Sequence, residues 1–387
     1  MGLTPRADLR TARLRANAAY ELVLFDRLSG PEQEVLEALG RDPEGYGVLR
    51  PRGEGPLSLK SVTRDIALLW LTLREPGPLP KYALRLLGDD CDRIVGQMIL
   101  DGILEIEAEE QMLSGMAALA LLGGDGDAAS DPGAIGGLSR RALEYAAMLE
   151  IPDALGLSAR LYGYNSVPAR EHWRRRWPDT AAIEHELGIE NGAWGALLPG
   201  WTRVAWGNAW IAWNRGDMKA ARDGTTYKLY ISPGCDALRT AFQEAAAAIA
   251  ACHGVHLKVG ASVFGLLRPD KMVGYFRELA DLQEAAERIL ERLADCPAQG
   301  VPFTAEIGGG GLLSWGVDPD RDQYAVPWLE RESWRARICN QLAGTLIQAR
   351  ASGCEDAEGA CRFARERLRL EGIDPETWAP TRELHWS

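Results

Sequence analysis

The segment that decides the fold runs from Thr63 to Leu113 and reads TRDIALLWLTLREPGPLPKYALRLLGDDCDRIVGQMILDGILEIEAEEQML. Its apolar residues recur at helical spacing in three short runs. Thr63 is a suitable N-cap for the first run, and a Pro-Gly-Pro sequence ends it. Gly88 ends the second run and Gly102 ends the third. The segment therefore predicts three consecutive helices.

A β-hairpin is predicted directly after the third helix. The sequence ILEIE alternates apolar and polar residues, Ala108-Glu109-Glu110 forms the turn, and QMLSG returns. Three helices followed by a two-stranded wing predict a winged-helix module over residues 60–122. A module used only for packing or dimerisation is the alternative interpretation.

Acidic residues dominate the third predicted helix, which would be the recognition helix of such a module. They are Asp89, Asp90, Asp92 and Asp101, and the whole chain has a formal net charge of −12. Nucleic-acid binding depends on a basic surface that displaces counterions from phosphate. The charge therefore excludes bulk nucleic-acid binding and favours a peptide as the module's ligand.

The regions before and after this module differ in composition. Residues 1–59 predict a helical segment with a break at Gly30-Pro31 and a loop over residues 42–56. Residues 123–138 are rich in Gly, Ala and Asp and predict a flexible linker. Residues 139–225 predict a helical connector rich in tryptophan, with Trp173, Trp177, Trp194, Trp201, Trp206, Trp210 and Trp213.

The C-terminal residues 226–387 alternate between strand-like and helix-like segments. Strands are predicted at TYKLYIS, VHLKVG, KMVGYF, VPFTAEI and GLLSWGV, and helices at CDALRTAFQEAAAAIAAC, ELADLQEAAERILERLAD and ESWRARICNQLAGTLIQA. Mixed strands and helices in this order predict an α/β sandwich domain. The predicted fold class is thus α+β, with an N-terminal helical and winged-helix part ahead of this domain.

Two of these strands carry cations on one face. Strand alternation places Lys228 beside Tyr230 in TYKLYIS, opposite the apolar face. The same alternation places His256 beside Lys258 in VHLKVG. Each strand therefore presents a positive charge on its polar face.

The turn LLRPDK, just downstream, adds Arg268 and Lys271. If the segments converge, these two residues form an anion site with Lys228, His256 and Lys258. Arginine binds phosphate or carboxylate in a bidentate manner, lysine acts as a point charge, and histidine gives or takes a proton. An ordinary solvated strand face is the alternative.

Other common catalytic and metal-binding patterns are missing from the sequence. The seven cysteines form no C-x-x-C pair and their number is odd, so they predict free thiols in a reducing, cytoplasmic location. Neither a metal site nor a cofactor is predicted. No window is apolar enough for a signal core or a membrane span.

Two family resemblances add to these inferences. The stretch LLWLTLREPGPLPKYALRLLGDDCDRIVGQMILDGILEIE resembles the PqqD-like precursor-recognition elements of peptide-modifying enzymes. Residues 227–346, with YKLYISP, VHLKVG, RPDKMVGYF, GVPFTAEI, GLLSWGVDP and SWRARICNQLAGTL in this order, resemble the HopA-type effector lyases, which include the lyases of class V lanthipeptide and thioamitide biosynthesis.

The second resemblance implies that a lyase domain eliminates phosphate from a phosphoserine or phosphothreonine of a ribosomally made precursor peptide. Lys258 would be the base and His256 the acid, while Lys228, Arg268 and Lys271 would bind the phosphate. The expected partners are the precursor peptide and a kinase or other modifying enzyme, without nucleic acid or membrane. The alternative is a non-catalytic protein that delivers the peptide to a separate enzyme.

Overall fold

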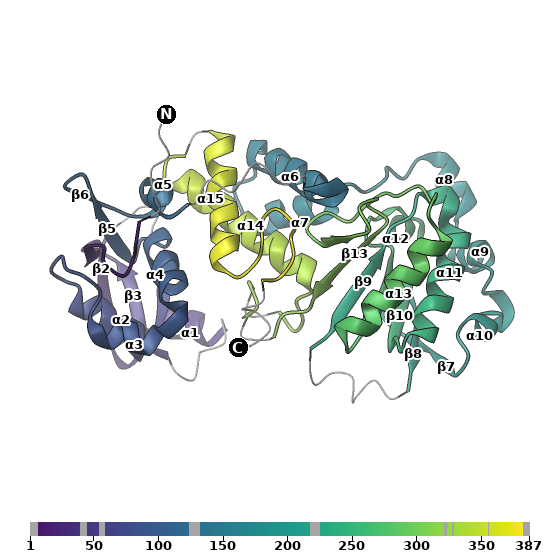
Figure 1. The fold of residues 1–387 in the computed structure, drawn as a ribbon, viewed down its shortest axis with the longest axis horizontal. Coiled ribbons are helices and arrows are strands. Elements are labelled where there is room, and N and C mark those ends of the chain that lie inside the picture. Colours follow the sequence, from purple (N-terminus) through teal and green to yellow (C-terminus); the bar gives the residue numbers. More distant parts are fainter. Residues whose placement is uncertain are drawn as a thin grey trace.

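A computed structural model describes residues 7–38, 45–53, 59–123, 132–216, 225–320, 323–326, 329–354 and 356–381. The chain forms three parts that lie in a row (Figure 1). An N-terminal part contains two small sheets, four long helices occupy the middle, and a large sheet with its covering helices forms the third part. The predicted α+β class is confirmed. No helix in the described ranges is both long and apolar enough to cross a membrane.

The N-terminal part contains two three-stranded antiparallel sheets, ordered β1-β5-β6 and β2-β3-β4. The strands are β1 (Leu14–Ala16), β2 (Tyr20–Leu24), β3 (Gly45–Pro51), β4 (Lys60–Thr63), β5 (Leu104–Ala108) and β6 (Gln111–Leu113). The helices are α1 (Gly30–Ala38), α2 (Arg64–Thr72), α3 (Lys81–Leu87), α4 (Cys91–Leu100) and α5 (Leu119–Leu122).

The three predicted helices and the hairpin are present as α2, α3, α4 and β5-β6. The Thr63 side chain accepts a hydrogen bond from the backbone N–H of Ile66 at 3.4 Å, as expected of an N-cap. Glu109 and Glu110 form the two-residue turn, with φ angles of 49° and 65°. The twist of a tight hairpin requires positive φ at both turn positions.

The prediction that residues 1–59 form a helical segment is wrong. Apart from α1 and a short 3-10 turn at Phe25–Arg27, the secondary structure described there is extended: β1, β2 and β3. Val48 and Leu49 in β3 are buried, and β3 pairs with both β2 and β4. Apolar residues in direct succession, such as Leu22-Val23-Leu24, fit a strand between packed layers as well as a helix. Pairing with a strand distant in the sequence makes this segment extended and not helical.

Four helices form the middle part: α6 (Gly133–Met148), α7 (Ala154–Gly163), α14 (Trp334–Ala351) and α15 (Ala357–Leu370). They share one hydrophobic core with the N-terminal part. Gln97 of α4 donates to the carbonyl of Leu370 at 3.0 Å, and Gln348 donates to the carbonyl of Leu100 at 3.3 Å. The N-terminal part is therefore packed against the middle helices.

The linker predicted at residues 123–138 lies largely outside the described residues, which resume at 132. Its last residues are helical, since α6 begins at Gly133. The carboxylate of Glu306 accepts a hydrogen bond from the backbone N–H of Ile135 at 3.1 Å. A carboxylate at a helix N-terminus accepts from free N–H groups and interacts favourably with the positive end of the helix dipole. This interaction explains why a helix begins in a glycine-rich sequence.

The third part is a seven-stranded antiparallel sheet ordered β12-β13-β9-β11-β10-β8-β7. Helices α11 and α13 cover one of its faces (Figure 1). The strands are β7 (Trp201–Ala205), β8 (Trp210–Arg215), β9 (Tyr227–Ile231), β10 (His256–Gly260), β11 (Met272–Phe276), β12 (Ala305–Ile307) and β13 (Leu313–Val317). The helices are α8 (Glu171–Arg176), α9 (Thr180–Leu187), α10 (Trp194–Leu197), α11 (Leu238–Ala251), α12 (Val263–Leu267) and α13 (Leu279–Arg292).

The five strands predicted in the C-terminal region are confirmed as β9 to β13. The prediction that residues 139–225 form a helical connector is wrong for its last part, because β7 and β8 form a hairpin at the edge of the same sheet. Gly207, in the loop of this hairpin, has a φ of 59°. Tryptophans on either side of a glycine turn also fit two paired strands, since aromatic residues are favoured in sheets.

Candidate functional site

The candidate site lies on the sheet face opposite α11 and α13. Strand alternation places Lys228 of β9 and His256 of β10 directly across from Tyr275 of β11. Lys258, two residues along β10, lies on the same face. The other face carries Leu257 and the rest of the helix-covered core. Adjacent strands thus bring the three predicted site residues onto one surface, as the sequence predicted.

Lys258 lies among aromatic rings. Its Nζ is 4.1 Å from the ring centroid of Trp210 and 5.5 Å from that of Tyr275. Within the described part of the chain, Lys258 has neither a hydrogen bond nor an ion pair. Burial, and then the neighbouring charge of Lys228, lower the pKa of Lys258 to about 7. A substantial fraction of this amine is therefore neutral near neutral pH.

His256 is buried and neutral. Its Nδ1 donates to Oδ1 of Asn214 at 2.5 Å, and its ring contacts those of Trp206 and Tyr275 at centroid distances of 4.5 and 4.8 Å. Burial, and then the charge of Lys258, lower the pKa of His256 to about 3. Its Nε2 is buried and has no hydrogen-bond partner in the described structure. A neutral imidazole whose only proton is bound to Asn214 is not arranged as a general acid.

Lys228 is buried and paired. Its Nζ lies 2.6 Å from Oδ1 of Asp318 and 5.2 Å from the ring centroid of Tyr275. Asp318 follows directly after β13, the strand that neighbours β9. The carboxylate offsets the positive charge of Lys228, so this lysine contributes less net charge to the surface than the sequence alone suggests.

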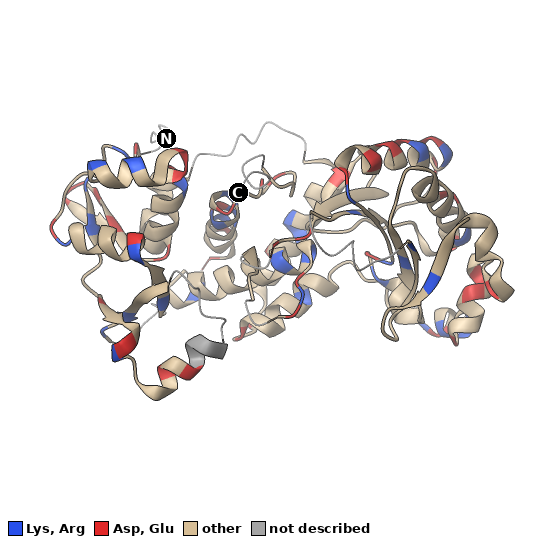
Figure 2. Cartoon of the chain, turned by 90° about the horizontal axis from the view of Figure 1, so that it is seen from below, with Lys and Arg blue, Asp and Glu red and all other residues tan. Residues whose placement is uncertain are grey.

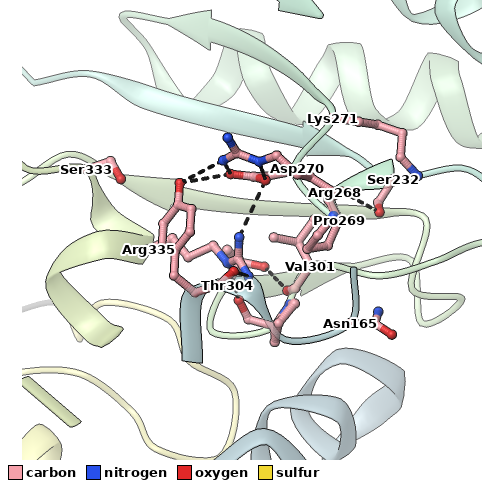
Figure 3. Close-up of polar contacts among 12 residues, drawn as sticks. Asn165, Ser232, Arg268, Pro269, Asp270, Lys271, Val301, Thr304, Ser333 and Arg335 are labelled. Carbon is pink, nitrogen blue, oxygen red and sulfur yellow. Dashed lines mark hydrogen bonds and ion pairs between the residues drawn. The ribbon is translucent and has the colours of Figure 1, made fainter. Parts of the chain in front are cut away.

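Arg268 reaches the same face from the turn after α12. Its Nε and Nη2 bind the two carboxylate oxygens of Asp270 at 2.9 and 2.7 Å (Figure 3). Its guanidinium also lies 5.2 Å from the ring centroid of Trp210, on which Lys258 rests. Burial is the largest single effect and lowers the pKa of Arg268, but the charge and hydrogen bond of Asp270, together with those of Tyr162, outweigh it and raise the pKa. Arg268 and Lys258 therefore share Trp210 as a common surface.

Asp270 connects the sheet to the middle helices. It accepts a hydrogen bond from the hydroxyl of Tyr162 on α7 at 2.9 Å, and Arg335 on α14 lies 3.5 Å away. Arg335 also donates to the carbonyls of Pro302, at 3.1 Å, and Tyr162, at 2.6 Å. Burial favours the neutral carboxyl, but Arg335 and then Arg268 outweigh it and lower the pKa of Asp270. This buried ionic network fixes the position of Arg268.

Lys271 does not join the cluster, contrary to the prediction. Its side chain runs away from the pair of Arg268 and Asp270 (Figure 3). Its Nζ donates to the carbonyl of Pro233 at 2.8 Å and to Oε1 of Gln299. It is fully buried, and burial lowers its pKa to about 8. The reason is local: one backbone carbonyl and one side-chain amide bind this ammonium, whereas Arg268 binds Asp270.

An open pocket borders the cluster. Trp206, Gly207, Trp210 and Arg331 line a cavity of about 390 Å³, within the size range of small-ligand sites. Arg331 is exposed, and its guanidinium lies 5.8 Å from the ring centroid of Trp206. Charges of both signs are spread over the helices of all three parts (Figure 2), so this is a local concentration of cations and not part of a basic surface.

Several site residues were missed in the sequence. Tyr275 alternates onto the site face of its strand, and Trp206 and Trp210 flank a glycine turn, so a local signal existed for these three. Asp318, Tyr162, Arg335 and Arg331 come from distant segments that only the folded chain brings together. In the described ranges no three His, Cys, Asp or Glu side chains are grouped so as to hold a metal ion.

Comparison with known proteins gives distant structural neighbours only. The chain is similar to an effector protein from Pseudomonas syringae pv. tomato strain DC3000, with 12% identity and a TM-score of 0.37 over 65% of this chain and 98% of that one. It is also similar to an effector protein from Pseudomonas syringae pv. syringae strain 61, with 14% identity and a TM-score of 0.36 over 64% of this chain and 98% of that one. No family model and no curated protein matches the sequence. The function is therefore argued from the site itself.

Proposed function

We propose that this chain is a lyase that eliminates phosphate from a phosphoserine or phosphothreonine of a peptide, with Lys258 as the base. The observation that carries the proposal is the state of Lys258: an amine without an ion pair in the described structure, with a pKa of about 7, beside an open pocket that holds an arginine. A general base works best when its pKa is near the operating pH.

The proposed reaction removes the α-proton and the phosphate from adjacent carbons. The neutral amine of Lys258 takes the proton from Cα, the electron pair of that bond forms the Cα=Cβ double bond, and the Cβ–O bond breaks. Phosphate leaves with the bonding electrons, and the peptide keeps a dehydroamino acid. Lys258 gains a positive charge as the phosphate departs, so the base itself helps to stabilise the leaving group.

Arg331 and Arg268 are the proposed phosphate ligands. Arg331 borders the pocket and is exposed. Arg268 lies next to the pocket, since its guanidinium is 5.2 Å from the ring centroid of Trp210, which lines it. Arginine presents paired N–H donors that match phosphate oxygens. Lys228 adds a weaker field because Asp318 offsets its charge.

His256 has a positioning role in this proposal. His256 is in the wrong protonation state to act as an acid, because its pKa of about 3 keeps the imidazole neutral. Phosphate is a good leaving group when cations offset its charge, so the elimination needs no proton from His256. The imidazole instead holds the rings of Trp206 and Tyr275, which face the pocket and Lys258 respectively.

Peptide recognition by the N-terminal part completes the proposal. Leu68 and Leu71 of α2 and Leu86 of α3 are about half exposed, an apolar surface that a peptide can cover. Asp101 is not on that surface, because it is paired with Lys60 at 3.0 Å and with Arg367 at 2.7 Å. A ribosomally made precursor of the lanthipeptide kind, phosphorylated by a separate kinase in the cytoplasm, is the proposed substrate.

The test is turnover of a synthetic phosphoserine peptide by the purified chain, followed by phosphate release and mass spectrometry. Lys258→Ala should abolish release while leaving peptide binding unchanged, because a base acts in the transition state. Lys258→Arg is the matched control, because arginine keeps a cationic side chain at this position but stays protonated and therefore cannot accept the proton. It should also be inactive. Binding without release by the wild type would make the chain a non-catalytic peptide carrier.

A further inference from the structure

Strand β7 forms one edge of the seven-stranded sheet, because it is last in the strand order, next to β8. Thr202, Arg203 and Ala205 of this strand are exposed. The strand contains neither proline nor lysine, which commonly block such an edge, and the guanidinium of Arg203 pairs with Glu184 of α9. An edge of this kind offers free backbone N–H and C=O groups to another extended chain.

The hydrogen bonds of the neighbouring strands identify which residues carry these free groups. Arg215 of β8 donates its backbone N–H to the carbonyl of Val255, just before β10, at 3.0 Å. Bonding alternates along an antiparallel strand, so the odd-numbered residues of β8 bond to β10 and its even-numbered residues bond to the even-numbered residues of β7. Arg203 and Ala205 therefore direct their N–H and C=O groups away from the sheet. In the described part of the chain these groups have no backbone partner.

Strand β7 leads directly into the pocket of the candidate site. Trp206 and Gly207, the next two residues of the chain, line that pocket. Val204 lies on the same face of the sheet as Lys258, because Ala212 is directly opposite both residues. A strand added to β7 would therefore run toward the pocket, and every second side chain of that strand would point to the face of the candidate site.

We propose that the outward backbone groups of Arg203 and Ala205, named here the β7 edge, bind the substrate peptide as an additional β-strand. This step rests on the proposed function. The occupant is the extended segment on one side of the phosphorylated residue, and that residue itself lies past Ala205, at the pocket lined by Trp206 and Gly207. Main-chain hydrogen bonds to a sheet edge hold an extended peptide in a defined register.

The shortness of the β7 edge favours a peptide over a second copy of this chain. Two copies joined by this edge alone would have far less contact than a stable interface needs. A substrate peptide is also held by its phosphate in the pocket, so a few backbone hydrogen bonds are enough to raise its affinity. Proline is excluded wherever the peptide N–H must donate. The substrate class is therefore a phosphopeptide with an extended flanking segment that lacks proline at alternate positions.

An N-methyl scan of a phosphopeptide tests the added strand. The probe is acetyl-Ala-Ala-Ala-phosphoserine-Ala-Ala-Ala-amide, in which N-methylalanine replaces each alanine in turn. Calorimetric titration into the full chain carrying Lys258→Ala measures the dissociation constant without release of phosphate. Methylation removes one N–H donor, so binding should weaken at least about tenfold where that N–H faces β7 and less than about threefold where it faces away. Sensitive positions should therefore alternate on one side of the phosphoserine. Equal losses at all positions, or no loss at any, would overturn the proposal.

The variant Ala205→Pro tests the protein's side of the same contact. Proline removes the outward N–H of Ala205 and places a ring on the edge, and it removes no hydrogen bond to β8. The unmethylated peptide should bind at least about tenfold more weakly, while inorganic phosphate should bind as before. Arg203→Ala is the control, because it removes a side chain paired with Glu184 and keeps the backbone groups, so it should change neither affinity. Unchanged peptide binding by Ala205→Pro, or equal loss in Arg203→Ala, would contradict an added strand.

Phosphate release from the unmethylated peptide by the wild type separates this proposal from the proposed function. Alternating sensitivity in the binding scan, with no release by the wild type, would support the added strand and refute the lyase. Release by the wild type without alternating sensitivity would support the lyase and refute the added strand.

Discussion

Lys258 Nζ lies 4.1 Å from the ring centroid of Trp210, and no carboxylate in the described structure pairs with it. Its neighbours Lys228 and Arg268 each have an aspartate partner. A lysine that is desolvated by aromatic rings and repelled by a nearby cation loses its proton more readily. The consequences can be measured without knowing the natural substrate.

Lys258→Met should stabilise the protein near neutral pH. The folded-state pKa of Lys258 is about 7, below its unfolded value of 10.5, so the folded state binds fewer protons between these values. The wild type therefore becomes more stable as pH rises from about 7 toward 10.5, and its lysine costs most stability below pH 7. Thermal unfolding from pH 6 to 9 should show a smaller rise in Tm for Lys258→Met. Identical pH profiles for both proteins would contradict the shifted pKa.

Asp318→Asn should move the activity profile to lower pH. The substitution removes the carboxylate that offsets the charge of Lys228, and it also removes a direct attraction that raises the pKa of Lys258. Both changes lower the pKa of Lys258, so the midpoint of the rise in phosphate release should fall below that of the wild type. Affinity for inorganic phosphate should increase. Asp320→Asn is the nearby control and should change neither quantity.

Asp270→Asn should destabilise the fold strongly. Asp270 is buried and bound by Arg268, Arg335 and Tyr162, so the substitution leaves two guanidinium groups without their carboxylate. Removing one partner of a buried pair costs about 3–5 kcal/mol. The free energy of unfolding in urea measures this loss. Asp236→Asn breaks an exposed pair with Arg176 and should cost less than about 1 kcal/mol. Similar losses in both variants would mean that the network adds no stability.

Glu110→Gly should stabilise the β5-β6 hairpin. Glu110 has a φ of 65°, where a side chain is strained by about 1–2 kcal/mol and glycine is not. Part of this gain is offset because glycine is more flexible in the unfolded chain. The net increase in the free energy of unfolding should be about 0.5–1 kcal/mol. Glu107→Gly, within strand β5, is the control and should be destabilising.

The sequence predicts the site face well where the information is local. Alternation within β9 and β10 is enough to put Lys228, His256 and Lys258 on one side, and the turn before β11 supplies Arg268. The prediction for Lys271 is wrong because closeness to Arg268 in the sequence does not determine where a side chain in a turn points. Its ammonium binds the carbonyl of Pro233 instead.

Information from distant segments explains the remaining differences. Asp318 offsets the charge of Lys228 because the strand order places β13 beside β9. Arg335 reaches Asp270, the partner of Arg268, because α14 packs against the sheet. The sequence predicts a helical connector where β7 and β8 lie, because tryptophan content alone does not distinguish a helix from a strand. The pairing of β8 with β10 makes this segment extended. Pairing between remote segments is what a single sequence does not display.

The most direct test is the pH dependence of phosphate release from a phosphoserine peptide under single-turnover conditions. The account predicts a rise with pH that has its midpoint near 7, the pKa of Lys258, and a shift of that midpoint to lower pH in Asp318→Asn. Because the second ionisation of a phosphate monoester lies near pH 6, the shift in Asp318→Asn is what assigns the midpoint to the protein. Release that persists in Lys258→Ala, or a midpoint that does not move in Asp318→Asn, would contradict Lys258 as the base.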